Sequence, residues 1–314
     1  MTLTELRYIV AVARERHFGR AAETCHASQP TVSVAIRKLE EELGVRLFER
    51  RAGEVSPTAV GERVIAQAQR VLEEAAAVHE IARQGRDPLS GPLRLAAIYT
   101  IGPYLLPALV RQVQRDLPQM ALLLNENFTA RLIEMLRIGE IDAAIMALPL
   151  PEAGLAIAPL YDEPFVVAVP RGHPWARRKA VAVEDLAGQT HLLLGSGHCF
   201  RDQVLDACPD IDRPGTAEGR NRPIEGSSLE TIRQMVAAGI GVAVLPATSV
   251  PARAQRDTFI VYLPFRRQVP SRRVVLAWRR SFTREAAIGA LCAAVQRCSL
   301  VGAHKIEAPR GRAA

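Results

Sequence analysis

FGRAAETCHASQPTVSVAIRKLEEELGVRLFER occupies residues 18–50 and predicts two helices joined by a tight turn. The first helix is expected over about 18–24. Ser28 is placed to cap the second helix, because its side-chain oxygen can accept from a backbone N–H of the first turn, where Pro30 is tolerated. Apolar residues then recur at helical spacing up to Gly44, which ends the helix. The pair therefore predicts a helix-turn-helix unit.

A compact N-terminal domain over residues 1–58 is expected around this unit. An amphipathic helix precedes the unit, and two short strands are expected at 45–50 and 54–57, hinged on Ala52–Gly53. Together these elements predict an all-α winged helix-turn-helix domain with a small β-wing.

The outward face of the second helix is polar and suits the major groove of DNA. Short polar side chains can reach base edges or phosphates, and basic side chains can neutralise phosphates. The candidate DNA contacts are Ser28, Gln29, Pro30, Thr31, Ser33, Arg37, Lys38 and Arg50. The pattern alone also fits a small helical bundle with a solvated polar face, so that alternative stays open at this point.

One long helix is expected from about residue 58 to 85. Apolar residues follow alternating four- and three-residue steps along it, at Val64, Ala68, Val71, Ala75, Val78 and Ala82. Such a seam is typical of a closely packed coiled coil, and a lone helix that carries it needs a partner. We therefore expect a linker and dimerisation helix at 59–87, followed by a short linker rich in Pro, Gly and Ser.

The remaining chain predicts an α/β regulatory domain over residues 91–303. Strands alternate with helices there, which favours two lobes with largely parallel sheets. We expect lobe I at about 91–161 and 267–303, and lobe II at about 162–266. Among the expected elements are strands at 165–169 and 183–187, helices at 199–207 and 281–298, and a frayed tail after Val301.

Composition and charge leave the function open. Apolar residues make up 48% of the 314 residues, and no stretch approaches the roughly 20 uncharged apolar residues that span a bilayer. The start of the sequence does not read as a secretory signal, so a cytoplasmic protein with no membrane partner is expected. The net charge of +7 arises from residues 252–314, which carry 13 Lys/Arg against 3 Asp/Glu. This charge lies far from the predicted DNA reader and is therefore weak evidence for nucleic-acid binding.

Three of the five cysteines are expected to be packing residues. Cys25 precedes the second helix of the DNA-reading pair, and Cys292 and Cys298 lie on the predicted closing helix. The sequence contains no CxxC motif and no Cys/His cluster with zinc-ligand spacing, so neither a metal nor a cofactor is expected.

Cys199 and Cys208 are placed differently. Cys199 opens a predicted helix, and the helix N-terminus together with His198 and Arg201 would favour its thiolate. Cys208 follows nine residues later, which at about 1.5 Å per residue puts the two Cα atoms roughly 13 Å apart along a helix. A disulfide needs Cα atoms within about 7 Å. Either the two cysteines never meet, or they form a switch in which the helix must unwind before the bond closes.

The N-terminal motifs resemble those of the LysR-type transcription regulators. The resemblance rests on FGRAA at 18–22, SQPTVS at 28–33, IRKLE at 36–40, LGVRLFER at 43–50 and TAVG at 58–61. It implies binding to double-stranded DNA. It also implies a regulatory domain of two Rossmann-like lobes, similar to periplasmic binding proteins.

The remaining motifs resemble the peroxide-sensing branch of that family. They include GHCFRDQ at 197–203 followed by Cys208, SGPL at 90–93, GPYLLP at 102–107, DEP at 162–164, HPWA at 173–176 and SLET at 228–231. The resemblance implies a sensor of hydrogen peroxide that activates antioxidant genes, with Cys199 peroxidatic and Cys208 resolving.

This resemblance also implies further site residues and partners. Thr100 and Thr129 would help to hold the peroxide, and Arg272 would lie near the thiol. The implied partners are RNA polymerase, a cellular thiol reductant and further copies of the chain, as a dimer through the linker helix and as a tetramer. The stretch 209–223 is longer than the family pattern suggests, and a longer loop changes closure entropy only slowly.

Other functions remain as alternatives to the peroxide sensor. The first is a LysR-type regulator triggered by a small metabolite bound between the lobes, with incidental cysteines. A solute-binding protein is disfavoured by the N-terminal reader domain. A thiol oxidoreductase or peroxidase lacks its CxxC motif, and a Ser/His/Asp hydrolase lacks a GxSxG elbow. An enzyme is therefore not expected.

Overall fold

The computed structural model describes residues 1–51, 54–84, 88–150, 154–211, 223–251, 254 and 257–306. The chain divides near residue 86 into two compact units, which are described one at a time. The predicted hinge at Ala52–Gly53 and residues 212–222 of the long stretch after Cys208 lie outside the described residues. Within the described part, no helix is long and apolar enough to cross a membrane.

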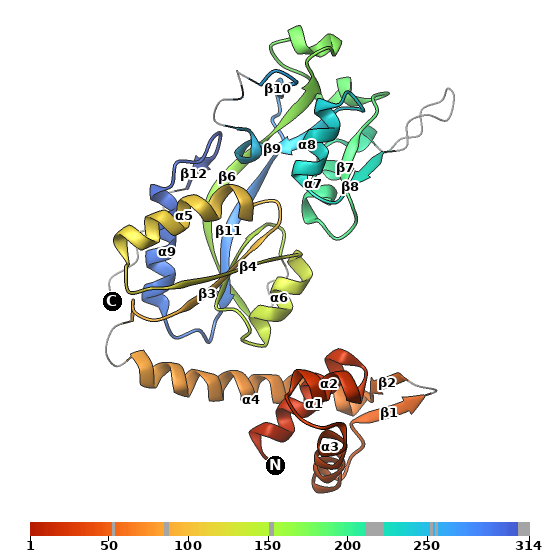
Figure 1. The fold of residues 1–314 in the computed structure, drawn as a ribbon, viewed down its shortest axis with the longest axis vertical. Helices are drawn as coiled ribbons and strands as arrows, with labels where there is room; N and C mark the ends of the chain where they lie inside the picture. Colours follow the sequence, from red (N-terminus) through yellow and green to blue (C-terminus); the bar gives the residue numbers. More distant parts are fainter. Residues whose placement is uncertain are drawn as a thin grey trace. The chain divides into compact units, whose positions relative to one another are not determined.

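The N-terminal unit has the predicted winged helix-turn-helix (Figure 1). In chain order its elements are α1 (Leu3–Glu15), α2 (Phe18–Thr24), α3 (Gln29–Leu43), β1 (Phe48–Arg51), β2 (Glu54–Pro57) and α4 (Ala59–Gln84). The Ser28 hydroxyl caps α3 by accepting from the Thr31 backbone N–H at 3.3 Å. Gly44 ends α3 in the left-handed conformation at φ 66°, which glycine adopts without strain. The antiparallel pair of β1 and β2 forms the wing.

The core of this unit lies where α1, α2 and α3 meet. Val32, Ile36 and Leu39 recur at three- and four-residue steps along α3 and are buried there against Ile9 and Val12 of α1. Because this stripe is buried, the opposite face of α3 carries the polar residues, which is the arrangement predicted for a DNA reader.

The linker helix α4 uses part of its apolar seam within its own chain. Ile65 and Ala68 are buried against the N-terminal core, and Val64 and Val71 pack beside them. Farther along the helix, the Val78 side chain is 65% exposed. The first half of the seam therefore packs on the domain itself, and only the later part remains for a partner helix.

The C-terminal unit is built from strands, α-helices and short 3-10 helices (η). Its elements are β3 (Leu93–Ile98), α5 (Gly102–Asp116), β4 (Leu122–Asn127), α6 (Thr129–Arg137), β5 (Ala143–Ala147), β6 (Leu155–Pro170), η1 (Pro174–Arg177), η2 (Val183–Leu186), β7 (Leu192–Leu194), α7 (Cys199–Ala207), η3 (Pro209–Ile211), β8 (Ile224–Gly226), α8 (Leu229–Ala237), β9 (Ala243–Pro246), η4 (Ala247–Ser249), β10 (Ile260–Pro264), β11 (Ser271–Arg279), α9 (Glu285–Arg297) and β12 (His304–Lys305).

The sheet is mixed, which corrects the expectation of largely parallel sheets. Its order is β10-β6-β11-β5-β3-β4, and β9 and β12 also pair with β6. Parallel pairing is found between β3 and both β4 and β5, whereas β11 runs antiparallel to β5 and β6. The reason is that β6 and β11 carry the chain between the lobes in opposite directions.

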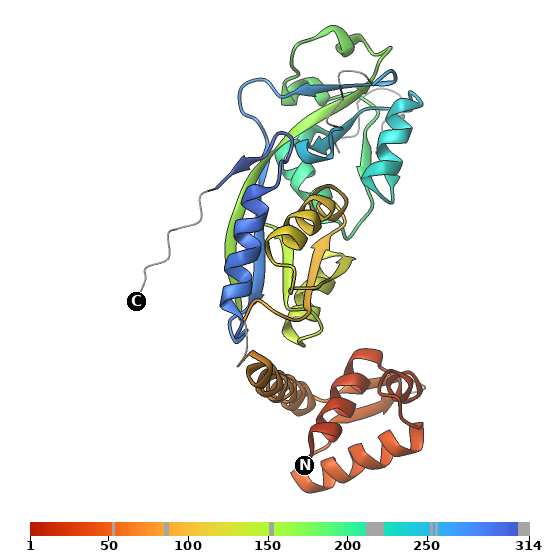
Figure 2. The same cartoon turned by 60° about the vertical axis from the view of Figure 1, so that its left-hand side comes forward.

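Two hydrophobic cores define two lobes, and β6 runs through both. Lobe I is the core formed by β3, α5, β5 and α9 with the first half of β6, up to Tyr161. Lobe II is the core formed by β7, α7, α8 and β9 with the second half of β6, from Phe165 onward. Figures 1 and 2 both show β6 as one long strand that passes from one lobe into the other.

One expected strand of the C-terminal unit is confirmed but is longer than predicted, and two other local expectations there were wrong. The expected strand 165–169 is the second half of the longer strand β6. The expected strand 183–187 is the 3-10 helix η2, whose Asp185 carboxylate accepts from the Ala182 backbone N–H at 2.9 Å and turns the chain there. The tail after Val301 is not frayed as far as it is described, because β12 pairs with β6.

Candidate functional site

Helix α7 carries both predicted redox cysteines at its two ends. Cys199 is its first residue and Cys208 caps its C-terminus, where the Cys208 backbone N–H donates to the Val204 carbonyl at 2.9 Å. Both thiols are free. The structure confirms a continuous helix between the two cysteines, and the rise of such a helix corresponds to a Cα separation of roughly 13 Å.

The two faces of α7 pack against different lobes. Phe200, Val204 and Cys208 are spaced four residues apart and are buried in the lobe II core, each at most 2% exposed. Cys199 is half-buried and packs against the lobe I core. Gln203, one turn after Cys199, donates through Nε2 to the Leu148 carbonyl at 2.8 Å, at the end of lobe I's strand β5. Helix α7 therefore joins the two lobes.

The two sulfurs have different surroundings. Burial among apolar side chains raises the pKa of the Cys208 thiol to about 11, so this thiol stays protonated at neutral pH. Cys199 instead stands at the N-terminus of α7, whose N-cap residue His198 offers no side-chain hydrogen bond to the first turn. An effect of the positive end of the helix dipole on the Cys199 sulfur stays a prediction.

Three aromatic rings bring the turns of the site together. The ring of His198 lies 4.8 Å from that of Phe128 and 6.0 Å from that of Tyr99, and the rings of Tyr99 and Phe128 are 5.2 Å apart, all centroid to centroid. The residues that follow these three in the chain are the predicted site residues Thr100, Thr129 and Cys199. The end of β3, the start of α6 and the start of α7 therefore lie next to one another.

His198 and Arg201 have partners of their own. His198 is 8% exposed, and burial lowers its pKa below the ordinary value despite a hydrogen bond to the Ser227 backbone, so its ring is neutral at pH 7. The Arg201 guanidinium donates to the Leu194 carbonyl and to the Glu225 carboxylate, both at 2.8 Å. Positive charge from these residues at the Cys199 sulfur stays a prediction.

Arg272 lies in a buried network together with Thr100. Its Nη1 donates to Thr100 Oγ1 at 2.8 Å and its Nη2 to the Thr100 carbonyl at 3.1 Å. Its Nε donates to Glu163 Oε2 at 2.6 Å, and its guanidinium stacks 4.9 Å from the ring centroid of Phe200. Phe200 is the neighbour of Cys199 in the chain, so the structure brings Arg272 and Thr100 to the same region as the thiol.

Two polar atoms of the site are buried without a hydrogen-bond partner among the described residues. They are the Thr129 hydroxyl oxygen and the Gln203 Oε1 atom. Buried polar atoms in native structures normally have a partner, so such a pair indicates a place for a small polar ligand or water. Gln203 was not among the residues predicted from the sequence, although its position four residues after Cys199 places it on the same helix face.

The predicted DNA-reading residues share the polar face of α3. Gln29, Pro30, Thr31, Arg37 and Lys38 are exposed, and Ser33 is half-buried. The hydroxyls of Ser28 and Thr31 share a hydrogen bond of 2.7 Å at the helix start. Arg50 lies on β1, but its side chain is outside the described residues.

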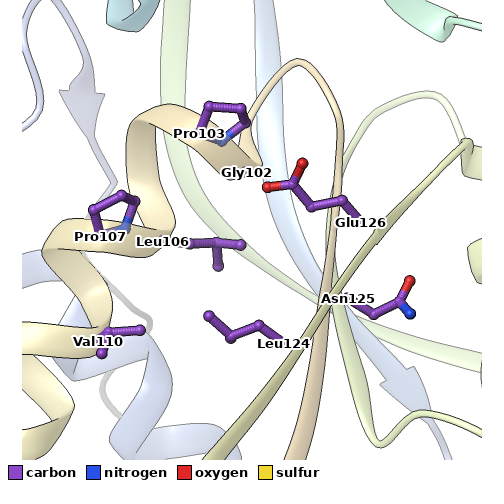
Figure 3. A pocket seen from close by; sticks show the side chains of 8 residues that line it. All are labelled: Gly102, Pro103, Leu106, Pro107, Val110, Leu124, Asn125 and Glu126. Atoms are coloured by element: carbon purple, nitrogen blue, oxygen red, sulfur yellow. The ribbon is translucent and has the colours of Figure 1, made fainter.

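A groove of about 460 Å³ lies on lobe I between α5 and β4 (Figure 3). Its lining is mainly apolar, with Leu106, Val110 and Leu124 beside the carboxylate of Glu126. Burial raises the pKa of Glu126, and its carboxylate lies so close to Gly102 that a Cβ there would collide with it. This groove belongs to lobe I alone, whereas the metabolite alternative needs a pocket between the lobes.

The other cysteines have packing environments. Cys25 and Cys292 are half-buried against the cores of their own units, and Cys298 is 3% exposed and donates its S–H to the Ala294 carbonyl. In the part of the chain that the structure describes, no three metal-ligating side chains gather in one place.

Comparison with known proteins assigns both parts of the chain to one family. Residues 3–62 match the bacterial regulatory helix-turn-helix proteins of the lysR family, and residues 86–298 match the LysR substrate binding domain. The hydrogen peroxide-inducible genes activator of Pectobacterium carotovorum is 43% identical over 279 residues, which are 89% of this chain and 90% of that protein. The DNA-binding transcriptional dual regulator OxyR of Escherichia coli is 42% identical over the same shares.

Solved structures agree with this assignment. A full-length cysteine-to-aspartate variant of OxyR from Pseudomonas aeruginosa is 50% identical, with a TM-score of 0.77 over 98% of each chain. A cysteine-to-serine variant of Corynebacterium glutamicum OxyR with bound hydrogen peroxide is 34% identical, with a TM-score of 0.62 over 94% of this chain and 92% of that one. The chain therefore belongs to the LysR family of bacterial transcription regulators, a family of regulators and not of enzymes, and within it is a homologue of OxyR.

Proposed function

We propose that this regulator senses hydrogen peroxide through oxidation of Cys199 and formation of a Cys199–Cys208 disulfide, and that it activates antioxidant genes in response. The observation that carries the proposal is that the two free thiols stand at opposite ends of one helix, each against a different lobe. The names of the curated relatives and the peroxide-bound C. glutamicum structure support it.

The first step is attack of the Cys199 thiolate on one oxygen of the peroxide. An S–O bond forms, the O–O bond breaks, and the leaving hydroxide takes up a proton to become water. Cys199 becomes a sulfenic acid and peroxide is reduced by two electrons. This step needs the thiolate form of Cys199, which stands at the N-terminus of α7.

The polar atoms around Cys199 suit a small molecule with two hydroxyl groups. The Gln203 Oε1 atom can accept a hydrogen bond, and the Thr129 hydroxyl can both donate and accept. The Thr100 oxygen already accepts from Arg272, which leaves its own hydrogen to donate. Hydrogen peroxide donates two and accepts several hydrogen bonds, so it is matched by this set.

The second step requires α7 to unwind. The Cα separation must fall from roughly 13 Å to less than about 7 Å, which an intact helix does not permit. Once Cys208 leaves the lobe II core, its sulfur attacks the sulfur of Cys199, an S–S bond forms and water leaves. A cellular thiol reductant returns two electrons and restores both thiols. Because α7 joins the lobes, its unwinding changes their contact and supplies the signal.

The signal reaches DNA through the N-terminal unit. The polar face of α3, with Gln29, Thr31 and Arg37 exposed, is proposed to enter the major groove. The exposed part of the α4 seam around Val78 supports a dimer, and the family resemblance supports a tetramer that contacts RNA polymerase in the cytoplasm.

Peptide mass spectrometry before and after a brief peroxide pulse, combined with promoter footprinting, tests the proposal. The parent should form one disulfide between Cys199 and Cys208 and change its footprint. Cys199→Ser should do neither, whereas Cys292→Ser, a matched change at a half-buried thiol, should behave as the parent. An unchanged footprint in both the parent and Cys199→Ser would favour the metabolite-triggered regulator instead.

A further inference from the structure

A fully buried carboxylate is linked to the proposed peroxide site through Arg272. Glu163 of β6 is 0% exposed and faces Arg272 of β11 directly across the strand pair. Its Oε2 accepts from Arg272 Nε at 2.6 Å. Its Oε1 accepts from the Thr248 backbone N–H at 3.1 Å and from the Thr248 hydroxyl. Each carboxylate oxygen of Glu163 therefore has its own hydrogen-bond partner: Arg272 for Oε2 and Thr248 for Oε1.

Arg272 is held from several sides at once. Glu163 accepts a hydrogen bond from Nε, Thr100 accepts one from each terminal nitrogen, and the ring of Phe200 lies against the guanidinium. A guanidinium has a rigid, planar set of donors, so the orientation at Nε fixes the orientation of the other two nitrogens. Glu163 thereby fixes the direction from which Arg272 approaches Thr100.

The hydrogen bond from Arg272 determines in which direction the Thr100 hydroxyl can donate its own hydrogen. Its oxygen accepts the hydrogen bond from Nη1, so the hydroxyl hydrogen must point elsewhere. Within the described residues the structure records no acceptor for that hydrogen. The Thr100 side chain is 2% exposed, so the hydroxyl is presented to the site as a donor and does not face bulk water.

We propose that Glu163 is a positioning residue for the reaction of peroxide with Cys199, acting through Arg272 on the donor hydroxyl of Thr100. This inference rests on the proposed function. A peroxide oxygen that accepts from Thr100 is held in place, and its departure as hydroxide is favoured by the same hydrogen bond. Glu163 itself touches neither the peroxide nor the sulfur.

The substitution Glu163→Gln distinguishes an effect on the orientation of Arg272 from an effect of the Glu163 charge on the Cys199 thiolate. An amide has one accepting oxygen where the carboxylate has two, and even when that oxygen faces Arg272 the bond is no longer charge-assisted, so the amide holds the orientation of the guanidinium less firmly. Removal of a negative charge near Cys199 would by itself favour the thiolate. A slower reaction with peroxide therefore cannot come from the charge and must come from a change in orientation.

The experiment compares two reagents on the reduced full-length protein. Rates of Cys199 oxidation by hydrogen peroxide are measured by stopped flow, and rates of alkylation by iodoacetamide, which needs only the thiolate, are measured on the same samples. Glu163→Gln should lower the peroxide rate by about 10- to 100-fold, the scale of a small misplacement of a reactant. The iodoacetamide rate should be retained or raised.

Two further variants act as controls. Thr248→Val removes a donor from the far oxygen of Glu163 but leaves the bond to Arg272, so its peroxide rate should stay near that of the parent. In a Thr100→Val background, Glu163→Gln should cause little further loss, because both changes remove one interaction. If Glu163→Gln does not fold, Glu163→Asp, which keeps both oxygens but is shorter, should give an intermediate loss.

Failure of the positioning role of Glu163 and failure of the proposed peroxide sensing give different results. If the parent itself is not oxidised at Cys199, the proposed function fails. If the parent reacts and Glu163→Gln (or Glu163→Asp in its place) reacts equally fast, only the positioning role is overturned. Equal losses with both reagents, or an equal loss in Thr248→Val, would reduce Glu163 to a structural residue and also overturn it.

Discussion

Cys199 and Cys208 terminate the same helix, yet Cys199 packs on the core of lobe I and Cys208 is buried in the core of lobe II. A bond between them therefore cannot form by a local side-chain rotation. It requires the loss of the backbone hydrogen bonds of α7 and of the packing of Phe200 and Val204. In the proposed mechanism the stability of α7 thus sets the threshold for disulfide formation, and changes in that stability should be measurable as changes in the rate at which the disulfide forms.

The proposed division of roles between the two cysteines predicts the behaviour of Cys208→Ser. Attack on peroxide needs only Cys199, so the first oxidation should proceed at the parent rate. The sulfenic acid then has no partner and should persist long enough to form an adduct with dimedone, detected by mass spectrometry. Absence of the adduct combined with an intact disulfide-like mobility shift would contradict this assignment.

Loosening α7 should accelerate the second step without affecting the first. Val204→Ala removes two methyl groups at a side chain that is 1% exposed and should lower the free energy of unfolding by about 2 kcal/mol. The helix then unwinds more readily, so the disulfide should close faster after sulfenic acid formation. Quenched-flow alkylation followed by mass spectrometry measures both steps.

Val236→Ala is the matched control for this change. Val236 is 0% exposed in the same lobe II core but lies on α8, which does not unwind in the proposed mechanism. It should lower stability by a similar amount and leave the disulfide rate unchanged. Equal acceleration in both variants would show that general loosening of lobe II, and not α7, controls the step.

The buried thiol of Cys208 also predicts a dependence of stability on pH. Burial raises its pKa from 9.0 to about 11, so the folded state holds this proton more tightly than the unfolded chain does. The resulting stabilisation is complete below pH 9 and is lost as the pH rises through about 11. At pH 10 the loss should be about 1.4 kcal/mol relative to neutral pH.

Urea unfolding of the reduced protein at pH 7 and pH 10 measures this loss. The comparison is with Cys208→Ala, which keeps every other titrating group, including Cys292, whose pKa burial also raises to about 11. The parent should lose more stability than the variant between the two pH values. A parallel decrease in both proteins would mean that Cys208 already titrates as an exposed thiol.

Local sequence patterns predicted the elements that carry the function better than the strands that connect the lobes. Helix α7 and the turn-capped α3 follow directly from apolar spacing and capping residues. The first half of β6 was missed because Pro159 and Pro164 argue against a strand. The structure accommodates Pro159 where the register with β11 shifts between Val274 and Val275.

The site itself depends on contacts that no local pattern contains. Arg272 is separated by 109 residues from Glu163 and by 172 residues from Thr100, yet all three meet at the crossing between the lobes. Arg272 was predicted only through a family resemblance, and Glu163 lies in the DEP motif at 162–164 that carries this resemblance, but no pattern in the sequence indicated that it contacts Arg272. Convergence of this kind follows from how β3, β6 and β11 are ordered in the sheet, which periodicity does not specify.

The DNA-reading face gives the last prediction. Arg37 is exposed on α3 on the side opposite the buried stripe, where it can neutralise a phosphate. Arg37→Ala should weaken binding to promoter and unrelated DNA alike, and it should make the slope of log K against log salt shallower by about 1 for each phosphate that is no longer neutralised. Fluorescence anisotropy at several salt concentrations measures this slope. Arg115→Ala, an exposed arginine at the end of α5, should leave it unchanged. A normal slope in Arg37→Ala would remove Arg37 from the interface.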